Sequence, residues 1–181
     1  LIFVAKGYVL GQILCIIFAV FYGIVSFSAR YYGEMITYLG MSAPAALVAT
    51  ISWLRNPYKK SAEVKVARLT KGKTVLLFLA TGLVTWVFYY ILGALDTANL
   101  LVSTFSVTTS FLASMLLIFR SPMYALAYAL NDIVLVTLWV MAAFDDPSSV
   151  PMIACFLMFL FNDLYGFIQW KSMRKRQETD V

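Results

Sequence analysis

The chain has 181 residues, of which 62% are hydrophobic and 13% are charged, and its formal net charge is +5. A soluble domain is about half apolar and roughly a quarter charged, so this composition argues against a protein that faces water on most of its surface. The chain has no histidine, and its two cysteines, Cys15 and Cys155, lie within apolar segments. That pattern argues against zinc sites, a cysteine–histidine nucleophile and a disulfide scaffold.

Several apolar segments of about 20 residues are long enough to cross a hydrocarbon core of roughly 30 Å. We therefore predict an all-α integral membrane protein, folded as one compact domain, with six spans over residues 8–27, 31–54, 74–92, 98–119, 123–144 and 150–170. Residues 1–5 are apolar but too short to span, and we interpret them as the end of a truncated earlier helix. A signal peptide is not expected, because this stretch lacks a basic start and a small-residue cleavage site.

The charged residues indicate an orientation in the membrane. If the spans alternate in direction, every basic residue except Arg30 falls on one side, and the opposite loops carry Asp96, Asp145 and Asp146. The positive-inside rule then places the basic loops and the C-terminus in the cytoplasm. The positive charge is thus interpreted as topological, and no nucleic-acid partner is expected.

Two polar segments on the basic side allow more than one interpretation. The loop 55–73 is expected either as a solvated anchor or as a short basic helix on the inner leaflet. The tail 171–181 is expected to be frayed, and Trp170 just before it is interpreted as a residue of the aromatic belt at the membrane interface.

Polar side chains at mid-depth in a membrane are costly and tend to face a cavity or the interior of a bundle. The span 123–144 places Asn131 and Asp132 near the bilayer centre, and Tyr128 and Trp139 recur on one helical face with Asn131. We predict a binding surface on this helix. The alternative is hydrogen bonding between helices, with Trp139 as an interface anchor.

Two other spans carry similar groups. The last span repeats the dipeptide as Asn162 and Asp163, again as a binding site or a structural pair. The span 98–119 has a stripe of hydroxyl side chains that includes Ser106 and Ser110. Such a stripe can line a pathway, and it can equally let helix backbones approach closely.

The first two spans are poorer in polar groups. Gln12 lies toward the cytoplasmic side of the span 8–27. In the span 31–54, Pro44 frees the carbonyl of Gly40 and predicts a kink, with Tyr38 just outside it. The kink is interpreted either as a gating hinge or as a device for packing, since prolines are common in transmembrane helices.

Catalysis finds little support in these residues. No histidine is available as a base, and no phosphate-binding glycine loop is present for ATP-driven transport. Asp132 and Asp163 could form an intramembrane aspartyl site, but neither lies in the Tyr-Asp or Gly-x-Gly-Asp setting of that class. The chain is therefore expected not to be an enzyme and to use no cofactor or metal.

Several short motifs, spread over essentially the whole chain, resemble those of the bacterial PnuC nicotinamide riboside transporters. They are Lys6-Gly7, Phe21-Tyr22-Gly23-Ile24, Tyr31-Tyr32-Gly33-Glu34-Met35, Ile51-Ser52-Trp53-Leu54-Arg55-Asn56-Pro57, Ala127-Tyr128-Ala129-Leu130-Asn131-Asp132-Ile133-Val134, and Asn162-Asp163-Leu164-Tyr165-Gly166-Phe167-Ile168-Gln169-Trp170.

The resemblance implies a fold similar to the SWEET sugar carriers, with two three-helix units joined by a linker helix. On that plan residues 1–54 are the remainder of the first unit, 55–97 the basic loop and linker helix, 98–170 the second unit, and 171–181 a cytoplasmic tail. It further implies a homotrimer in the bacterial cytoplasmic membrane, in contact with membrane lipids.

The resemblance also implies facilitated diffusion of nicotinamide riboside, followed by phosphorylation inside the cell. Asp132 or Asp163 would balance the pyridinium charge, and Tyr128 or Trp139 would stack on the ring. Asn131 and Asn162 would form hydrogen bonds with the carboxamide or the ribose hydroxyls. The family's usual asparagine in the span 8–27 and its Asp-Ser pair in the span 98–119 are not found here, where Cys15 to Phe18 and Ser103-Thr104 stand instead.

Other functions stay open at this point. The same kind of carrier could take another vitamin or nucleoside, such as thiamine or riboflavin. From other classes, the chain could be a helical membrane enzyme or an assembly subunit that transports nothing.

Overall fold

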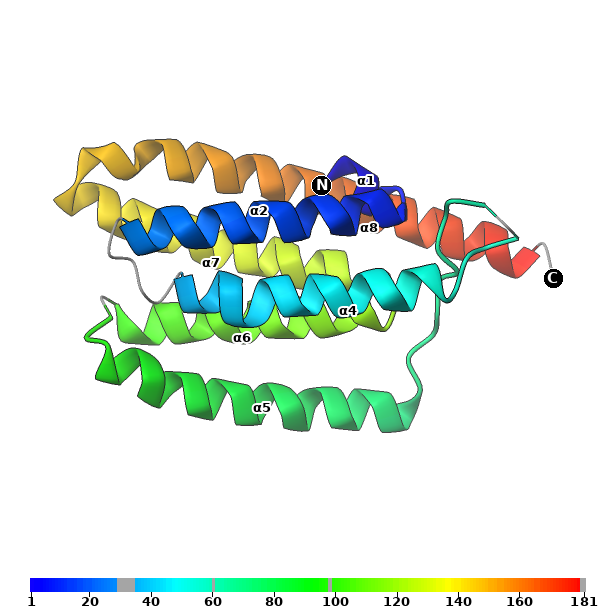
Figure 1. Ribbon diagram of the computed structural model, residues 1–181, viewed down its shortest axis with the longest axis horizontal. Helices are drawn as coiled ribbons and strands as arrows, with labels where there is room; N and C mark the ends of the chain where they lie inside the picture. The colour runs from blue at the N-terminus through cyan, green and yellow to red at the C-terminus, as the bar shows by residue number, and fades with distance from the viewer. Residues whose placement is uncertain (29–34, 60, 98, 180–181) are drawn as a thin grey trace.

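A computed structural model describes residues 1–28, 35–59, 61–97 and 99–179, and its ordered elements are helices (Figure 1). An apolar helix satisfies its backbone hydrogen bonds internally, which a membrane requires. In chain order the elements are α1 (Ile2–Ala5), α2 (Val9–Ser28), the π-helix η1 (Thr37–Ser42), α4 (Ala43–Leu54), α5 (Lys71–Ala94), α6 (Leu100–Ile118), α7 (Met123–Asp145), the 3₁₀ turn η2 (Pro147–Ser149) and α8 (Val150–Thr179).

The helices follow the predicted spans in position. Within the described residues, five are long and apolar enough to cross a membrane: Thr37–Leu54, Lys71–Ala94, Leu100–Ile118, Met123–Phe144 and Pro147–Thr179. The helix α2 is also apolar, but its described apolar part, Val9–Ile24, is shorter. The sixth span therefore stays a prediction, while the all-helical membrane fold is confirmed.

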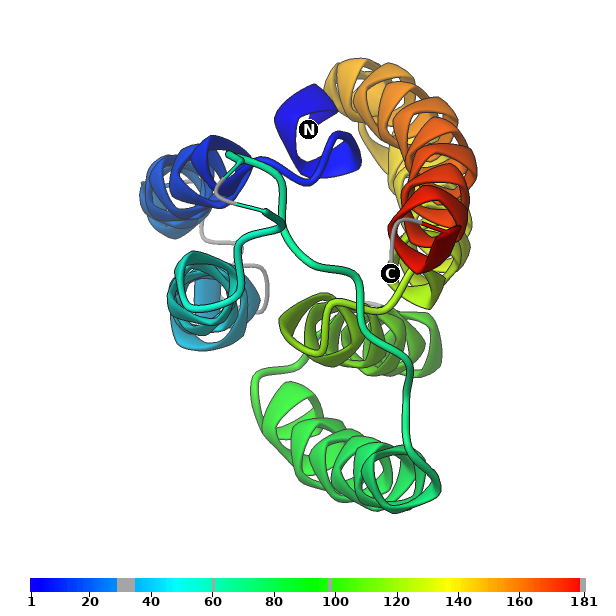
Figure 2. The same cartoon turned by 90° about the vertical axis from the view of Figure 1, so that its right-hand side faces the viewer.

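Six of the helices surround a central space. Viewed along the bundle in Figure 2, α1, α2, α4, α6, α7 and α8 follow one another in a ring, and α5 lies outside it against α6. The short α1 closes the ring between α2 and α8. This close approach needs Gly11, because a Cβ atom there would lie 2.5 Å from the backbone nitrogen of Val4.

The two ends of the ring differ in charge. At one end, the turn between α1 and α2, the segment 55–70, the turn between α6 and α7, and the C-terminal part of α8 meet; we call this the basic end (Figure 1). Backbone bonds join these parts, from Val64 N–H to the Gly7 carbonyl and from Ala67 N–H to the Arg120 carbonyl, both at 3.0 Å. The acidic end holds the α5–α6 and α7–η2 turns with Asp96 and Asp146. Arg30 lies outside the described residues.

The segment 55–70, which we call the strap, crosses the basic end of the ring (Figure 2). In the part of the strap that the structure describes, the chain forms turns and an extended stretch and no helix, so of the two alternatives expected for this loop the helix on the inner leaflet is not formed there. Its polar backbone is bonded within the protein, with isolated bridges from Glu63 to Tyr8 and from Val64 to Pro57. Those bonds replace the ones that a surface helix would make with itself.

The tail after residue 170 is also more ordered than predicted. The helix α8 continues to Thr179, and its Gln177 side chain accepts from Val66 N–H at 2.8 Å and donates to the Val64 carbonyl at 3.1 Å. These bonds to the strap hold the last turns of the helix. Trp170, predicted to be a belt residue, is fully buried at 0% exposure.

The predicted kink at Pro44 takes the form of a π-helical turn. The N–H of Ala43, just before the proline, donates to the carbonyl of Tyr38, five residues earlier. A proline lacks an N–H and collides with the carbonyl four residues before it, so a wider turn relieves the strain. Its role as a hinge stays a prediction.

We expect Gly11→Ala to lower the stability of the protein by about 1–3 kcal/mol, because the added methyl group overpacks the contact between α2 and α1. Thermal unfolding in detergent measures the effect. Gly82→Ala in α5 is the matched control, since nothing lies within 4 Å of a Cβ there. An unchanged melting temperature for Gly11→Ala would show that α1 does not pack as described.

Candidate functional site: a cavity inside the helical ring

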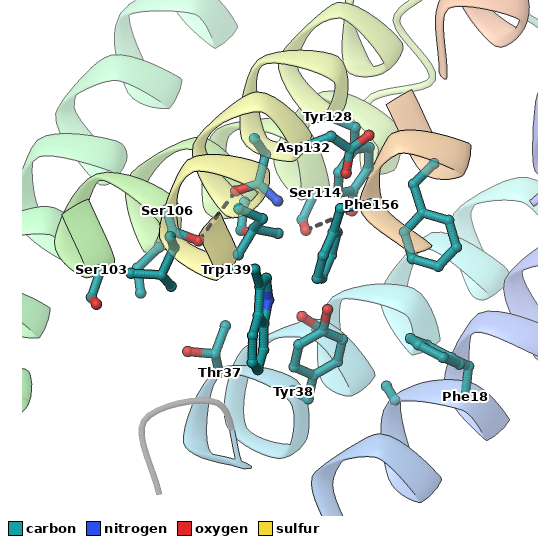
Figure 3. Close-up of a pocket in the computed structure, with 18 of the residues that line it drawn as sticks. Phe18, Thr37, Tyr38, Ser103, Ser106, Ser114, Tyr128, Asp132, Trp139 and Phe156 are labelled. Carbon is teal, nitrogen blue, oxygen red and sulfur yellow. Dashed lines mark hydrogen bonds between the residues drawn. The ribbon is translucent and has the colours of Figure 1, made fainter. Parts of the chain in front are cut away.

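The ring encloses a cavity of about 540 Å³, to which every helix of the ring and the π-helix η1 contribute side chains. Ligand pockets in proteins commonly measure about 300–1,000 Å³. Its walls combine hydroxyl, amide and carboxyl groups with aromatic rings, as Figure 3 shows. The cavity is therefore the natural candidate for the functional site.

One wall is a network of hydrogen bonds between α6 and α7. The Thr109 hydroxyl donates to Asn131 Oδ1 at 2.8 Å, and the Ser106 hydroxyl approaches the same oxygen at 3.5 Å. Nearer the basic end, Ser114 and Tyr128 join their hydroxyl groups at 3.0 Å (Figure 3). Because the hydroxyls of α6 hold the oxygen of Asn131, its Nδ2 group is left as a donor toward a ligand.

Two carboxyl groups meet where α7 and α8 pack together. Asp132 and Asp163 are neighbours, both are buried, and both line the cavity. Asn162 donates to Asp163 Oδ1 at 3.3 Å, whereas Asp132 Oδ2 is buried and has no hydrogen-bond partner among the described residues. Within the described residues, no group of three or more Cys, Asp or Glu side chains is placed to hold a metal ion. The pair thus presents polar oxygens to the cavity.

Aromatic rings enclose the part of the cavity nearer the acidic end. Trp139 of α7 and Tyr38 of η1 reach into the same space from different elements, with Phe156 and Phe18 beside them (Figure 3). Tyr38 also packs on the ring of Tyr22 at 4.3 Å between centroids. The π-helical turn before Pro44 carries Tyr38, so the irregular backbone places an aromatic ring at the site. Rings of this kind can stack on a flat ligand or a cationic one.

Gln12 of α2 is the most isolated polar group of the cavity. Its side chain is fully buried, and both its amide nitrogen and its amide oxygen lack a hydrogen-bond partner within the described structure. A buried amide without partners costs free energy. Gln12 is thus ready to pair with a ligand that offers one donor and one acceptor.

The structure brings together most of the side chains that the sequence singled out. Those that line the cavity are Gln12, Tyr38, Ser106, Ser110, Tyr128, Asn131, Asp132, Trp139 and Asp163. Asn162 is not among the lining residues, and it contacts the cavity only through Asp163. Pro44 does not line the cavity either, although Ser42 and Ala45 on either side of it do.

Comparison with known proteins identifies the family. The family described as nicotinamide mononucleotide transporter matches residues 1–172. The chain belongs to this transporter family. Its spanning helices and central cavity agree with a multi-pass membrane transporter.

Two relatives of the PnuC type carry the comparison further. The nicotinamide riboside transporter PnuC of Neisseria mucosa is 28% identical over 180 residues, which cover 97% of this chain and 68% of that protein. A solved structure described as the vitamin B3 transporter PnuC aligns with a TM-score of 0.81 at 28% identity, covering 97% of this chain and 77% of the other. Both relatives are transporters, which agrees with the expectation of a protein that is not an enzyme.

Sequence reasoning missed some of the cavity wall in this PnuC-type chain. Phe18 shares a face of α2 with Gln12 and Cys15 at spacings of three residues, a signal that could have revealed it. Ser114 also lines the cavity, four residues after Ser110 on the hydroxyl stripe of α6, but it was not selected. Phe156 could not be found in the same way, because the flanking positions of α8 are apolar all round.

We expect Gln12→Met to raise the melting temperature of the ligand-free protein by the equivalent of about 1 kcal/mol or more, because the change removes two unpartnered buried atoms at similar volume. Thermal unfolding measures the shift. Gln169→Met, at a half-buried position outside the cavity, serves as the control and should have little effect. A lower melting temperature for Gln12→Met alone would mean that the Gln12 amide is satisfied.

Proposed function

We propose that this chain carries nicotinamide riboside across the bacterial cytoplasmic membrane. The observation that carries the proposal is a cavity in the core of a PnuC-type transporter whose wall holds aromatic rings, amide groups and the buried carboxyl groups of Asp132 and Asp163. Nicotinamide riboside has a flat cationic ring, a carboxamide and ribose hydroxyls. Each of these features has a chemically matching group in the wall.

The pyridinium ring would stack against Trp139 or Tyr128 and lie close to Asp132 and Asp163. Cation–π attraction contributes about 0.5–2 kcal/mol, more when the site excludes water. Asp132 Oδ2, which has no hydrogen-bond partner in the described part of the chain, supports this role because a cationic or donor group would satisfy it.

The carboxamide and the ribose would bind the amide groups. Gln12 offers an amide that has no partner within the described residues and can form two parallel hydrogen bonds with a ligand carboxamide. Asn131 Nδ2, Ser106, Ser110 and Tyr38 would serve the ribose hydroxyls. Asn162 acts through its bond to Asp163 rather than by touching the substrate.

The transport mode is proposed as facilitated diffusion, with phosphorylation inside the cell trapping the product. Alternating access would come from rocking of the two three-helix units about the cavity, with the π-helical turn before Pro44 as a hinge. The arrangement with α5 outside the ring supports its role as the linker helix between α1, α2 and α4 on one side and α6, α7 and α8 on the other.

On this plan the units span residues 1–54 and 98–170, the basic loop and linker 55–97, and the tail 171–181. The grouping of basic residues at one end of the ring supports a cytoplasmic C-terminus. A homotrimer embedded in membrane lipid is proposed for the assembly; the long row of exposed apolar residues on α5 is consistent with a lipid-facing or subunit-facing surface.

The second candidate is a carrier for thiamine or riboflavin, favoured by the same stacking rings and carboxyl pair. Binding of the purified protein to nicotinamide riboside, thiamine, riboflavin and uridine separates the candidates. We expect nicotinamide riboside to bind most tightly and uridine, which lacks a positive charge, most weakly. Binding of thiamine without nicotinamide riboside would transfer the proposal to the second candidate.

We expect Asp132→Asn to weaken binding of nicotinamide riboside at least about tenfold, equivalent to about 1.4 kcal/mol, while binding of an uncharged analogue changes less. Isothermal titration of both ligands measures the difference. Glu178→Gln, a surface acid paired with Arg68 at 2.9 Å, is the matched control and should bind normally. An equal loss of affinity for both ligands would show that Asp132 does not recognise the positive charge of the substrate.

We expect liposomes containing the protein to equilibrate nicotinamide riboside without accumulating it, whether or not a sodium or proton gradient is imposed. Accumulation should appear when a kinase and ATP are enclosed in the liposomes. Uptake of radiolabelled substrate measures both. Gradient-driven accumulation without the kinase would contradict facilitated diffusion.

A further inference from the structure

The cavity is closed at the basic end by a dense plug of side chains. Its lining residues there, Val4, Leu117 and Tyr124, are all buried. Behind them lie Trp53 and Trp170, each at 0% exposure, so water does not reach either indole ring. At the opposite, acidic end the lining includes the exposed side chains of Asp96, Asn99 and Asp146. The described cavity therefore communicates with the acidic end, and its wall also includes the exposed Leu1 before α1, whereas its lining at the basic end is buried.

Two tryptophans bind the two halves of the ring to each other through the plug. Trp53 on α4 donates its Nε1–H to the carbonyl of Leu117 on α6 at 3.2 Å. Trp170 on α8 donates its Nε1–H to the carbonyl of Val4 on α1 at 3.0 Å. Each half of the ring thus contributes one indole that bonds to the backbone of the other half.

The same tryptophans also touch each other. Their ring centroids are 5.3 Å apart, and Tyr124 of α7 packs edge-on against Trp170 at 4.9 Å. Aromatic pairs at such distances attract each other beyond simple burial of area. The rings and the two indole hydrogen bonds therefore form one contact that spans the ring from α4 to α8.

The strap covers this contact from outside. Val64 of the strap and Met173 of α8 are buried in the same cluster as the two tryptophans. The strap is held by Gln177 through two backbone bonds and by an ion pair between Glu63 and Arg176. A substrate leaving the cavity toward the basic end has to pass both layers.

We propose that Trp53 and Trp170 form the gate of the transport pathway at the basic end, and that passage requires the two indole rings to separate. The inference rests on the proposed transport function. Neither tryptophan lines the cavity, so this role is separate from substrate binding. Separation breaks both indole hydrogen bonds together, because each one joins opposite halves of the ring.

A native cysteine offers a direct reporter of the gate. Cys15 lines the cavity and packs on the plug from the cavity side. The other cysteine, Cys155, is replaced in a Cys155→Ser background so that Cys15 alone reacts. A membrane-impermeant thiol reagent is applied separately to each side of vesicles, and the side is assigned by tryptic cleavage of the basic tail after residue 170.

We expect Cys15 to react from the acidic-end side and only slowly from the basic-end side when the gate is intact. Trp170→Ala should speed labelling from the basic-end side at least tenfold, because it removes one ring and one cross-ring hydrogen bond. Trp86→Ala, which removes an exposed indole on α5, is the matched control and should leave the rate unchanged. Equal rates for Trp170→Ala and Trp86→Ala would overturn the gate.

Two further variants keep the test decisive if Trp170→Ala does not fold. Trp170→Phe and Trp53→Phe retain a ring but lose the indole hydrogen bond, and each should speed basic-side labelling by a smaller factor. An unchanged rate in both would also overturn the gate. Labelling needs no substrate, so the gate can be tested even if nicotinamide riboside is not taken up. Normal uptake of nicotinamide riboside together with unchanged labelling rates in the variants would reject the gate and leave the proposed function standing.

Discussion

Polar groups inside the helical ring need partners that hydrocarbon cannot supply, and this constraint organises the structure. Some hydroxyl side chains of the ring helices meet the need locally: Thr50 of α4 and Thr104 of α6 each donate to the carbonyl four residues earlier in their own helix. Longer amide and carboxyl side chains, such as Gln12 and Asp132, have no such local solution. Both line the cavity, and within the described residues both carry buried atoms without hydrogen-bond partners.

The same constraint acts at the ends of the helices, where the last carbonyl groups have no partner within the helix. Ser52 and Trp53 donate to two consecutive carbonyls at the end of α6, those of Ile118 and Leu117. The bonds that complete α6 are therefore also the bonds that join it to α4. The hydrogen bonds from Ser52 and Trp53 therefore both satisfy the last carbonyls of α6 and help to close the basic end. Opening that end would leave these carbonyls without their partners.

In the described part of the chain, an irregular turn interrupts one of the apolar helices beside the cavity. The π-helical turn over Thr37–Ser42 interrupts an otherwise regular helix beside Pro44, and it carries Tyr38 to the aromatic part of the wall. Opposite it, Trp139 of the regular helix α7 supplies a second ring (Figure 3). A proline that sequence reasoning treated as a kink thus shapes the binding surface through the turn that it imposes on its neighbours.

The sequence by itself determined the membrane fold, the positions of the helices, the grouping of basic loops at one end and the family, because long apolar segments and short motifs can be read locally. It also selected nine of the side chains that line the cavity, since a spacing of three and four residues reveals one face of a helix. Only the tertiary structure decided what each face meets: that Thr109 orients Asn131, that Asn162 lies behind Asp163, that Gln177 holds the strap, and that Trp170 is buried against Trp53. The rotation and crossing of helices decide these pairings, and they depend on packing between segments far apart in the chain, which no local pattern encodes.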